Sequence, residues 1–196
     1  MLLVHGPPGG VVGDTVGAMA ISPPALALLD RDDPWPLAGH VRGALQGPSA
    51  SVAWVGRVKA AAGPQSAWRA SRRLEDALTR AGAPSGDRRR VLSVLWSRLE
   101  GLAEADDLVL LLAARDEAGV ALSAVGVQRL YGARDGVLQT WLASPHPLLG
   151  APGVPARMPG ALVLPDLPSW VVGAADDSAL DGAPLQDVFV RCGVHG

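Results

Sequence analysis

The segment LVLLLAARDEAGVALSAVGVQRLYGARDGVLQTWLASPHPLLG, Leu108 to Gly150, decides the fold class of this chain. It consists of short apolar runs separated by polar or glycine-containing turns. One turn, Arg134-Asp135-Gly136, carries the Asp-Gly pair that favours a tight two-residue hairpin. Consecutive strands joined by such short turns pair antiparallel, so the segment predicts an antiparallel meander. The predicted strands are 108–114, 120–125, 128–133 and 137–142.

Two amphipathic helices are predicted before this meander. Trp68, Leu74 and Leu78 lie near one face of a helix over 66–81, and apolar residues at three- and four-residue spacings predict a second helix over 87–103. Residues 51–58 fit either a strand or a helix. Other expected elements are a short helix at 37–45 and strands at 16–21, 25–29, 161–164, 170–172 and 188–191. Strands, then helices, then strands is the order of an α+β domain and not of a doubly wound parallel sheet.

Composition narrows the class of protein. The chain has 196 residues, of which 48% are hydrophobic and 18% charged, which is typical of one folded domain, 1–196. Its single cysteine, Cys192, excludes an internal disulfide and any multi-cysteine metal site, and we expect a buried structural thiol. The net charge of −2 gives no overall field that would attract nucleic acid or an anionic membrane. The longest apolar run has seven residues and no targeting signal is visible, so we expect a cytoplasmic protein.

Three arginines, Arg88 to Arg90, fall in the first turn of the second predicted helix, directly after Asp87 as its N-cap. Positive charge is unfavourable at this end of a helix. A phosphate-binding role and a solvated helix start are both compatible with the cluster. We expect the segment HGPPGG at 5–10 to form a turn rather than a phosphate loop, because it lacks the lysine ending and two prolines remove backbone donors.

Four aspartates lie at the ends of apolar runs: Asp14, Asp30, Asp176 and Asp187. Carboxylates at strand ends converge easily at one rim of a β-sandwich, and hard divalent ions such as Mg²⁺ and Mn²⁺ prefer oxygen ligands of this kind. The alternative is that aspartate is simply common in turns next to strands. The sequence pattern alone leaves both interpretations open.

The meander resembles the centre of the metal-dependent serine/threonine protein phosphatases of type 2C. In that family a hairpin leads into Val-Gly-Asp-Ser-Arg-x-Tyr, followed by an Arg-Asp-Gly turn and a strand that ends before Asp-His. Here 125–131, VGVQRLY, and the Arg134-Asp135-Gly136 turn stand in those places, with Ser144-Pro145-His146 at the Asp-His position. The resemblance implies a fold of two packed antiparallel sheets, a β-sandwich, flanked by helices.

The same resemblance matches each of the four aspartates to a metal-binding motif of the family. Asp30 ends a strand similar to the one before the Asp-Gly that bridges two metals, and Asp14 stands for the upstream Glu-Asp. Asp176 follows a strand similar to the one ending in Ser-Asp-Gly, and Asp187 begins the counterpart of the closing Asp-Asn strand. These four residues are therefore the predicted metal ligands.

The chain also departs from the family pattern. Arg31 replaces the glycine that follows the bridging aspartate, and Val127 replaces the aspartate of Gly-Asp-Ser-Arg. Glycine at the first position permits close backbone approach to the metals. We expect the Arg31 guanidinium to pair with Asp30 or Asp14 and to occupy the metal position.

These departures favour a regulatory or scaffolding pseudophosphatase that binds a protein partner, such as a kinase or a phosphoprotein, and needs no cofactor. One alternative is a working phosphatase in which the four aspartates hold two Mn²⁺ or Mg²⁺ ions. A second alternative is an unrelated α+β interaction domain. Trp35 and Trp54 lie in segments broken by proline and glycine and are candidate interface residues, with core packing as the alternative.

Overall fold

The computed structural model describes residues 2–5, 21–29, 39–99, 107–143, 160–165, 170–175 and 179–191. These residues form strands in two sheets, together with three helices. In chain order the elements are β1 (Leu2–His5), β2 (Leu26–Leu29), β3 (His40–Gln46), β4 (Ser51–Lys59), α1 (Pro64–Thr79), α2 (Arg88–Leu99), β5 (Asp107–Asp116), β6 (Gly119–Val125), β7 (Arg129–Arg134), β8 (Val137–Ala143), β9 (Leu162–Leu164), β10 (Trp170–Ala174) and α3 (Leu185–Arg191).

Within the described residues, each sheet has five strands. Sheet A has the order β1-β2-β10-β7-β8, and sheet B has the order β3-β4-β5-β6-β9. Neighbouring strands pair antiparallel except β2 and β10, which run parallel to each other. Because β2 and β10 come from distant parts of the chain, long-range pairing forms the centre of sheet A.

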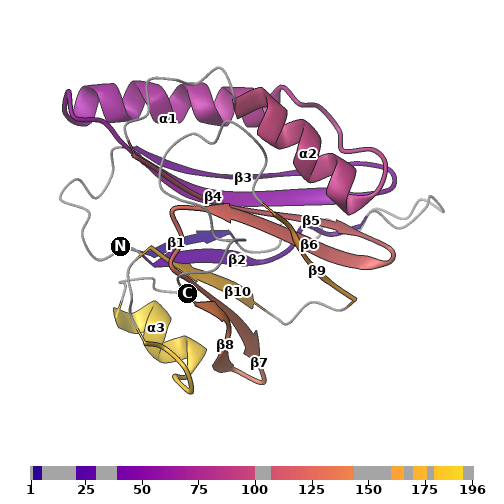
Figure 1. The fold of residues 1–196 in the computed structure, drawn as a ribbon, viewed down its shortest axis with the longest axis vertical. Helices are drawn as coiled ribbons and strands as arrows, with labels where there is room; N and C mark the ends of the chain where they lie inside the picture. Colours follow the sequence, from indigo (N-terminus) through magenta and orange to yellow (C-terminus); the bar gives the residue numbers. More distant parts are fainter. Residues whose placement is uncertain are drawn as a thin grey trace, which may run out of the picture.

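Figure 1 shows the sheets stacked face to face, with α1 and α2 covering sheet B and α3 beside sheet A. Side chains on a strand alternate between its two faces, and the core follows this rule. On β4, Val52 and Trp54 pack in the core under the helices, whereas Ala53 and Val55 pack in the core between the sheets. The predicted fold class, an α+β sandwich flanked by helices, is confirmed.

The predicted meander is correct in its strands but wrong in its continuity. Strands β5 and β6 form a hairpin in sheet B, and β7 and β8 form a hairpin in sheet A. Between β6 and β7 the chain crosses from one sheet to the other within residues 126–128. The second hairpin turns at Asp135 and Gly136, whose φ values of 54° and 76° are those of the predicted tight Asp-Gly turn.

Local sequence signals begin and end the two long helices. Pro64 is the first residue of α1, where its missing N–H costs nothing. Gly82, with φ of 77°, follows the end of α1 in the left-handed conformation that glycine tolerates best. The Asp87 carboxylate accepts hydrogen bonds from the backbone N–H groups of Arg89 and Arg90 at 2.9 and 3.0 Å. Asp87 is therefore the N-cap of α2, as predicted.

The short helix predicted at 37–45 is wrong, because residues 40–46 form strand β3. All seven residues of β3 pair with β4, and this long-range pairing outweighs the local preference of the segment. Gly43 shows the fit: a Cβ at this position would lie 2.7 Å from Cε2 of Trp54. The Trp54 indole therefore occupies the space that a side chain at position 43 would take.

The strand predicted at 188–191 is also wrong, because these residues belong to helix α3. Leu185 and Val188, three residues apart, are buried, whereas Gln186 and Asp187 between them are exposed. Leu185 and Val188 pack with Leu138 on the outer face of sheet A. A helix buries this pair on one side and leaves the polar residues in solvent, which a strand's alternation cannot do.

The structure describes some of the remaining predicted elements fully and others only in part. The ambiguous segment 51–58 is strand β4, and 66–81 contains α1 as expected. Residues 16–20 of one predicted strand and 100–103 of the second predicted helix lie outside the described residues. Across the described ranges, none of the helices combines the length and the hydropathy that crossing a bilayer requires.

Candidate functional site

Three strands of sheet A meet at one end of the sandwich. Strands β2 and β10 run parallel and end side by side, with Leu29 paired to Ala174. The backbone N–H of Ala175 donates to the Leu29 carbonyl at 2.9 Å. On the other side of β10, strand β7 begins at Arg129, which pairs with Ala174. We call this end of sheet A, formed by Leu29, Ala174 and Arg129, the candidate edge.

Sheet B reaches the same end of the sandwich through a short connection. Strand β6 ends at Val125 and β7 begins at Arg129, so only three residues separate the two sheets here. Gly126 makes this crossing possible: its φ is 66°, and a Cβ would lie 2.8 Å from the Leu108 carbonyl oxygen. Strand β5 begins beside this crossing, and Arg57, near the end of β4, pairs with Val109 of β5.

Two of the predicted metal ligands follow the paired strands directly in the sequence. Asp30 is the residue after Leu29, and Asp176 is the residue after Ala175. Asp14, Asp30 and Asp176, together with Arg31, lie outside the described residues. The structure thus brings together the strand ends that precede Asp30 and Asp176.

Asp187, the fourth predicted ligand, lies elsewhere. It is exposed in the first turn of α3, and the start of this helix is tied to the β7–β8 turn, where the Leu185 N–H donates to the Gly136 carbonyl at 2.7 Å. Further along α3, the ring of Phe189 contacts that of Trp170 with centroids 5.0 Å apart. Trp170 begins β10, so this contact lies about 13 Å along the strand from the candidate edge. The structure does not bring Asp187 to the strand ends that precede Asp30 and Asp176.

Val127 occupies the position that the resemblance assigns to a metal-binding aspartate. Its side chain is buried in the core between the sheets, where Cγ1 lies 3.5 Å from the place a Cβ on Gly173 would take. The next residue, Gln128, donates its backbone N–H to the Ala174 carbonyl at 2.8 Å, which fixes the segment against β10. An isopropyl group has no lone pair, so the side chain of Val127 supplies no ligand to an ion here.

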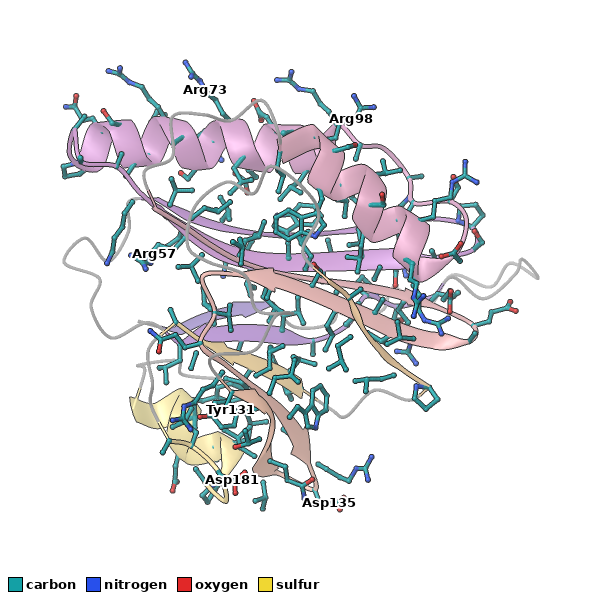
Figure 2. All side chains as sticks on the ribbon, in the orientation of Figure 1. Arg57, Arg73, Arg98, Tyr131, Asp135 and Asp181 are labelled. Atoms are coloured by element: carbon teal, nitrogen blue, oxygen red, sulfur yellow. The ribbon has the colours of Figure 1, made fainter. Side chains whose placement is uncertain are left out.

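Arg57 places a positive charge inside the same end of the sandwich (Figure 2). Its residue is only 4% exposed. Ala53 and Val55, which share its face of β4 by alternation, pack in the core between the sheets. An arginine side chain is cationic under physiological conditions and disfavours a divalent cation nearby. Among the described side chains at this end of the sandwich, Val127 and Arg57 therefore disfavour a divalent metal ion.

No group of three or more histidine, cysteine, aspartate or glutamate side chains that could hold a metal ion occurs within the described ranges. Arg57 was not among the site residues predicted from the sequence. In a strand over 51–58, side chains two residues apart point to the same side, so Arg57 shares a face with Ala53 and Val55. An arginine on the same face as these apolar residues would have predicted a charge pointing into the core. Because residues 51–58 fitted either a strand or a helix, the sequence did not assign Arg57 to a face.

Tyr131, the last residue of the segment VGVQRLY at 125–131, has a structural role. It is fully buried on the outer face of sheet A, in the cluster that contains Val172 and Val188. Its hydroxyl oxygen accepts the backbone N–H of Leu180 at 3.2 Å. Tyr131 therefore holds the segment that leads into α3 against the sheet.

The structure also shows how exposed the clustered arginines and two of the tryptophans are. Arg88 forms an ion pair with Asp116, with Nη1 and Oδ1 2.7 Å apart, whereas Arg89 and Arg90 are exposed. Trp54 is buried under the helices, so its assignment as an interface residue was wrong, and Trp35 lies outside the described residues. Trp68, which was expected on the apolar face of α1, is instead more than half exposed.

No protein family model and no curated protein sequence matches this chain. Among solved structures, the RsbU and RsbW domains of Rv1364c from Mycobacterium tuberculosis match 72% of this chain at 16% identity, with a TM-score of 0.49. The phosphatase domain of the cell fate determinant SpoIIE from Bacillus subtilis matches 57% of this chain at 18% identity, with a TM-score of 0.31. The matches span 40% and 49% of the lengths of those two chains.

Proposed function

We propose that this chain is a degenerate type 2C phosphatase-like domain that binds a protein partner without catalytic turnover. Its role would be that of a regulatory or scaffolding pseudophosphatase. The observation that carries this proposal is the pair Val127 and Arg57 at the end of the sandwich where β2 and β10 end together. A kinase or a phosphoprotein is the class of partner that the sequence resemblance favours.

Electrostatics gives the main argument against catalysis. The family chemistry needs two divalent ions close together, held by oxygen ligands. A divalent ion and a guanidinium repel each other, and this repulsion is stronger in the protein interior than in water because the dielectric constant is lower there. Arg57 is buried on the face of β4 that points between the sheets, so solvent screens its charge little. A metal pair at this end of the sandwich would have to overcome that repulsion without a side-chain oxygen from position 127.

A working Mn²⁺- or Mg²⁺-dependent phosphoprotein phosphatase is the second candidate. One observation favours it: Leu29 and Ala175 are joined by a backbone hydrogen bond, and each is followed in the sequence by an aspartate. In this candidate Asp30 and Asp176 would share the metals. The remaining ligands would come from Asp14 and, after a rearrangement of α3, from Asp187.

Hydrolysis of p-nitrophenyl phosphate separates the two candidates. We expect the wild-type protein with Mn²⁺ to show no more turnover than the Asp30→Asn variant, because no metal pair forms. Asp187→Asn is a matched control, since it removes the same charge from an exposed position on α3. Manganese-dependent turnover that Asp30→Asn abolishes would overturn the proposal and establish the phosphatase. If the Asp187→Asn variant then retained that turnover, Asp187 would not be one of the metal ligands.

A further inference from the structure

A small apolar groove lies beside α2, on the side of the molecule away from sheet A. Its floor comes from Val52 of β4 and from Val91 and Leu95 of α2, all of which are buried. Val94 stands at the groove with 42% of its surface exposed, and Arg90 lines it as well. The full lining is Leu45, Val52, residues 81–85, Arg90, Val91, Val94 and Leu95. We call this feature the α2 groove.

The wall of the groove is the connection between α1 and α2, and it is held in place on β3 and β4. Pro84 in this connection is buried, and a Cβ on Gly47 would lie 2.9 Å from its carbonyl carbon. The backbone N–H of Gly86 donates to the Ser49 hydroxyl at 3.3 Å. These contacts tie the connection to the β3–β4 turn, so the groove is formed before any partner arrives.

The size of the groove fits one side chain. Its volume is about 130 Å³. An apolar cavity of roughly 150 Å³ in another protein accommodates a benzene ring. The α2 groove therefore has room for one leucine, isoleucine or phenylalanine side chain, and it is too small for a nucleotide or another large cofactor.

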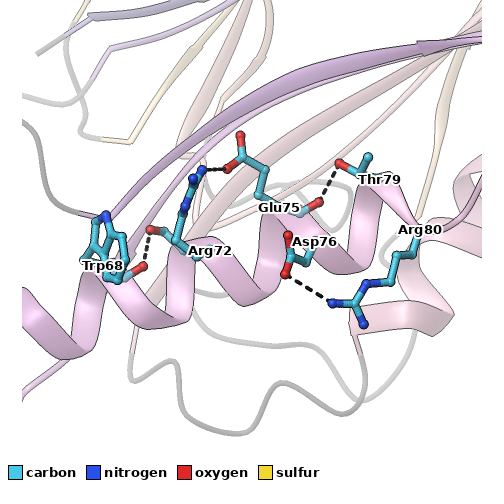
Figure 3. A network of polar contacts seen from close by, with 7 residues as sticks. Trp68, Arg72, Glu75, Asp76, Thr79 and Arg80 are labelled. Carbon is cyan, nitrogen blue, oxygen red and sulfur yellow. Dashed lines mark hydrogen bonds and ion pairs between the residues drawn. The ribbon is translucent and has the colours of Figure 1, made fainter.

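The helices around the groove are strongly basic, although the chain is not. Residues 64–99 contain eight arginines and three acids, a net charge of +5, which leaves −7 for the rest of the chain. Each of the three acids already has a partner. Glu75 pairs with Arg72 at 2.7 Å and Asp76 with Arg80 at 3.2 Å (Figure 3), and Asp87 caps α2.

Several arginines of this helix layer have no ion pair within the described part of the chain: Arg69, Arg89, Arg90 and Arg98. Three of these four belong to α2, whose Arg98 points away from the sheets in Figure 2. Arginine is one of the residue types that are enriched in protein-binding hot spots. A nucleic acid would use the arginines but has no side chain for the groove.

We propose that the α2 groove docks an acidic segment of a partner protein. One aliphatic or aromatic side chain of that segment fills the groove beside Val94, and the carboxylates of the segment pair with Arg90 and Arg98, which lie four residues before and after Val94 on α2. Charge complementarity supports this occupant, because a basic helix layer favours an acidic partner and speeds its encounter. The inference rests on the proposed function, since it supplies the surface through which the domain would bind its partner.

Selection from a random dodecapeptide library displayed on phage, with the whole chain immobilised, tests this proposal. We expect the enriched peptides to combine several Asp or Glu residues with one Leu, Ile or Phe. Fluorescence anisotropy then measures the affinity of an enriched peptide for groove variants. We expect Val94→Glu and Arg90→Glu each to weaken binding at least tenfold.

Matched controls use equivalent positions outside the groove. Val137→Glu replaces a valine of similar exposure, 39%, on the β7–β8 hairpin. Arg69→Glu makes the same charge change as Arg90→Glu, but on α1 about 18 Å of helix before the groove wall. We expect both control variants to bind the peptide within threefold of the wild type.

Three results would overturn the proposal: no enrichment over an unrelated protein, enriched peptides without acidic residues, or equal binding by the Val94→Glu variant. Arg69→Glu weakening binding as much as Arg90→Glu would also contradict it, because the arginines would then act as a diffuse charge. Tight binding of a single-stranded 20-mer DNA with no peptide enrichment would assign the surface to nucleic acid instead. Peptide binding is independent of p-nitrophenyl phosphate turnover, so this inference and the proposed function fail separately.

Discussion

Asp116 joins the start of α2 to the β5–β6 turn, and we predict that Asp116→Ala destabilises the protein by about 3 kcal/mol. Its Oδ1 accepts hydrogen bonds from Arg88 Nη1 at 2.7 Å and from the Ala118 backbone N–H at 2.9 Å. Its Oδ2 accepts the backbone N–H of Arg88 at 3.0 Å. One carboxylate therefore satisfies a helix terminus, a turn and a guanidinium.

The magnitude follows from how well this ion pair is shielded. The Arg88 and Asp116 side chains are 17% and 12% exposed. Removing one member of a buried pair costs about 3–5 kcal/mol because the other charge stays uncompensated, and the partial exposure here favours the lower end. For a chain of this size, 3 kcal/mol lowers the melting temperature by about 6–12 °C. Asp116→Asn keeps the shape and one acceptor oxygen, so we expect it to cost about half as much.

The same contacts make this contribution depend on pH. Burial raises the pKa of Asp116, but hydrogen bonds from the backbone N–H groups of Arg88 and Ala118 and the charge of the Arg88 guanidinium outweigh it. The net effect holds the pKa of Asp116 below its ordinary value of 3.8. The stabilisation is therefore complete above the unfolded-state pKa and is lost as the pH falls through the folded-state pKa. The stability difference between wild type and Asp116→Asn should be constant near neutral pH and shrink below pH 3.8.

Urea denaturation followed by tryptophan fluorescence measures these differences. Asp76→Ala is the control, because Asp76 forms an ion pair with Arg80 whose side chains are 63% and 79% exposed. Exposed pairs four residues apart on a helix contribute about 0.3–0.5 kcal/mol. An Asp116→Ala variant no less stable than Asp76→Ala would refute the argument that shielding decides the value of this pair.

Three further substitutions test other contacts of the fold. Tyr131→Phe leaves the buried Leu180 N–H without its acceptor, so we expect a loss of about 1–2 kcal/mol in urea denaturation and faster hydrogen exchange at the Leu180 amide. Gly43→Ala forces a methyl group against the Trp54 indole and should cost about 1–3 kcal/mol by the same assay, with a change in the near-UV circular dichroism of tryptophan. Asp87→Ala removes the N-cap of α2 and should cost about 1 kcal/mol; an unchanged midpoint of unfolding would contradict its capping role.

Local features of the sequence were sufficient for the elements whose cause is itself local. The apolar runs and short turns of 108–142 predicted the four strands β5 to β8, and the Asp135-Gly136 pair predicted the hairpin turn between β7 and β8. Asp87 predicted the cap of α2 because a cap needs only the next three residues.

The errors occurred where a distant segment decides the conformation. Residues 40–46 become a strand because β4 provides a full row of backbone partners. Residues 185–191 become a helix because the outer face of sheet A accepts Leu185 and Val188 on one side. The crossing at 126–128, which divides the expected meander between two sheets, likewise depends on the packing of one sheet against the other.

The sequence alone determined the α+β order of strands and helices, with aspartates after two of the strands, because apolar periodicity and turn residues act over a few neighbouring positions. Only the tertiary structure decided that the strands before Asp30 and Asp176 end side by side, and that Asp187 lies in the first turn of a helix tied to the β7–β8 turn. It also decided that Arg57 is buried between the sheets, since alternation gives a face only once the strand has its partners. Pairing between distant strands is set by the summed burial of both sheets, and no local window of the sequence contains that information.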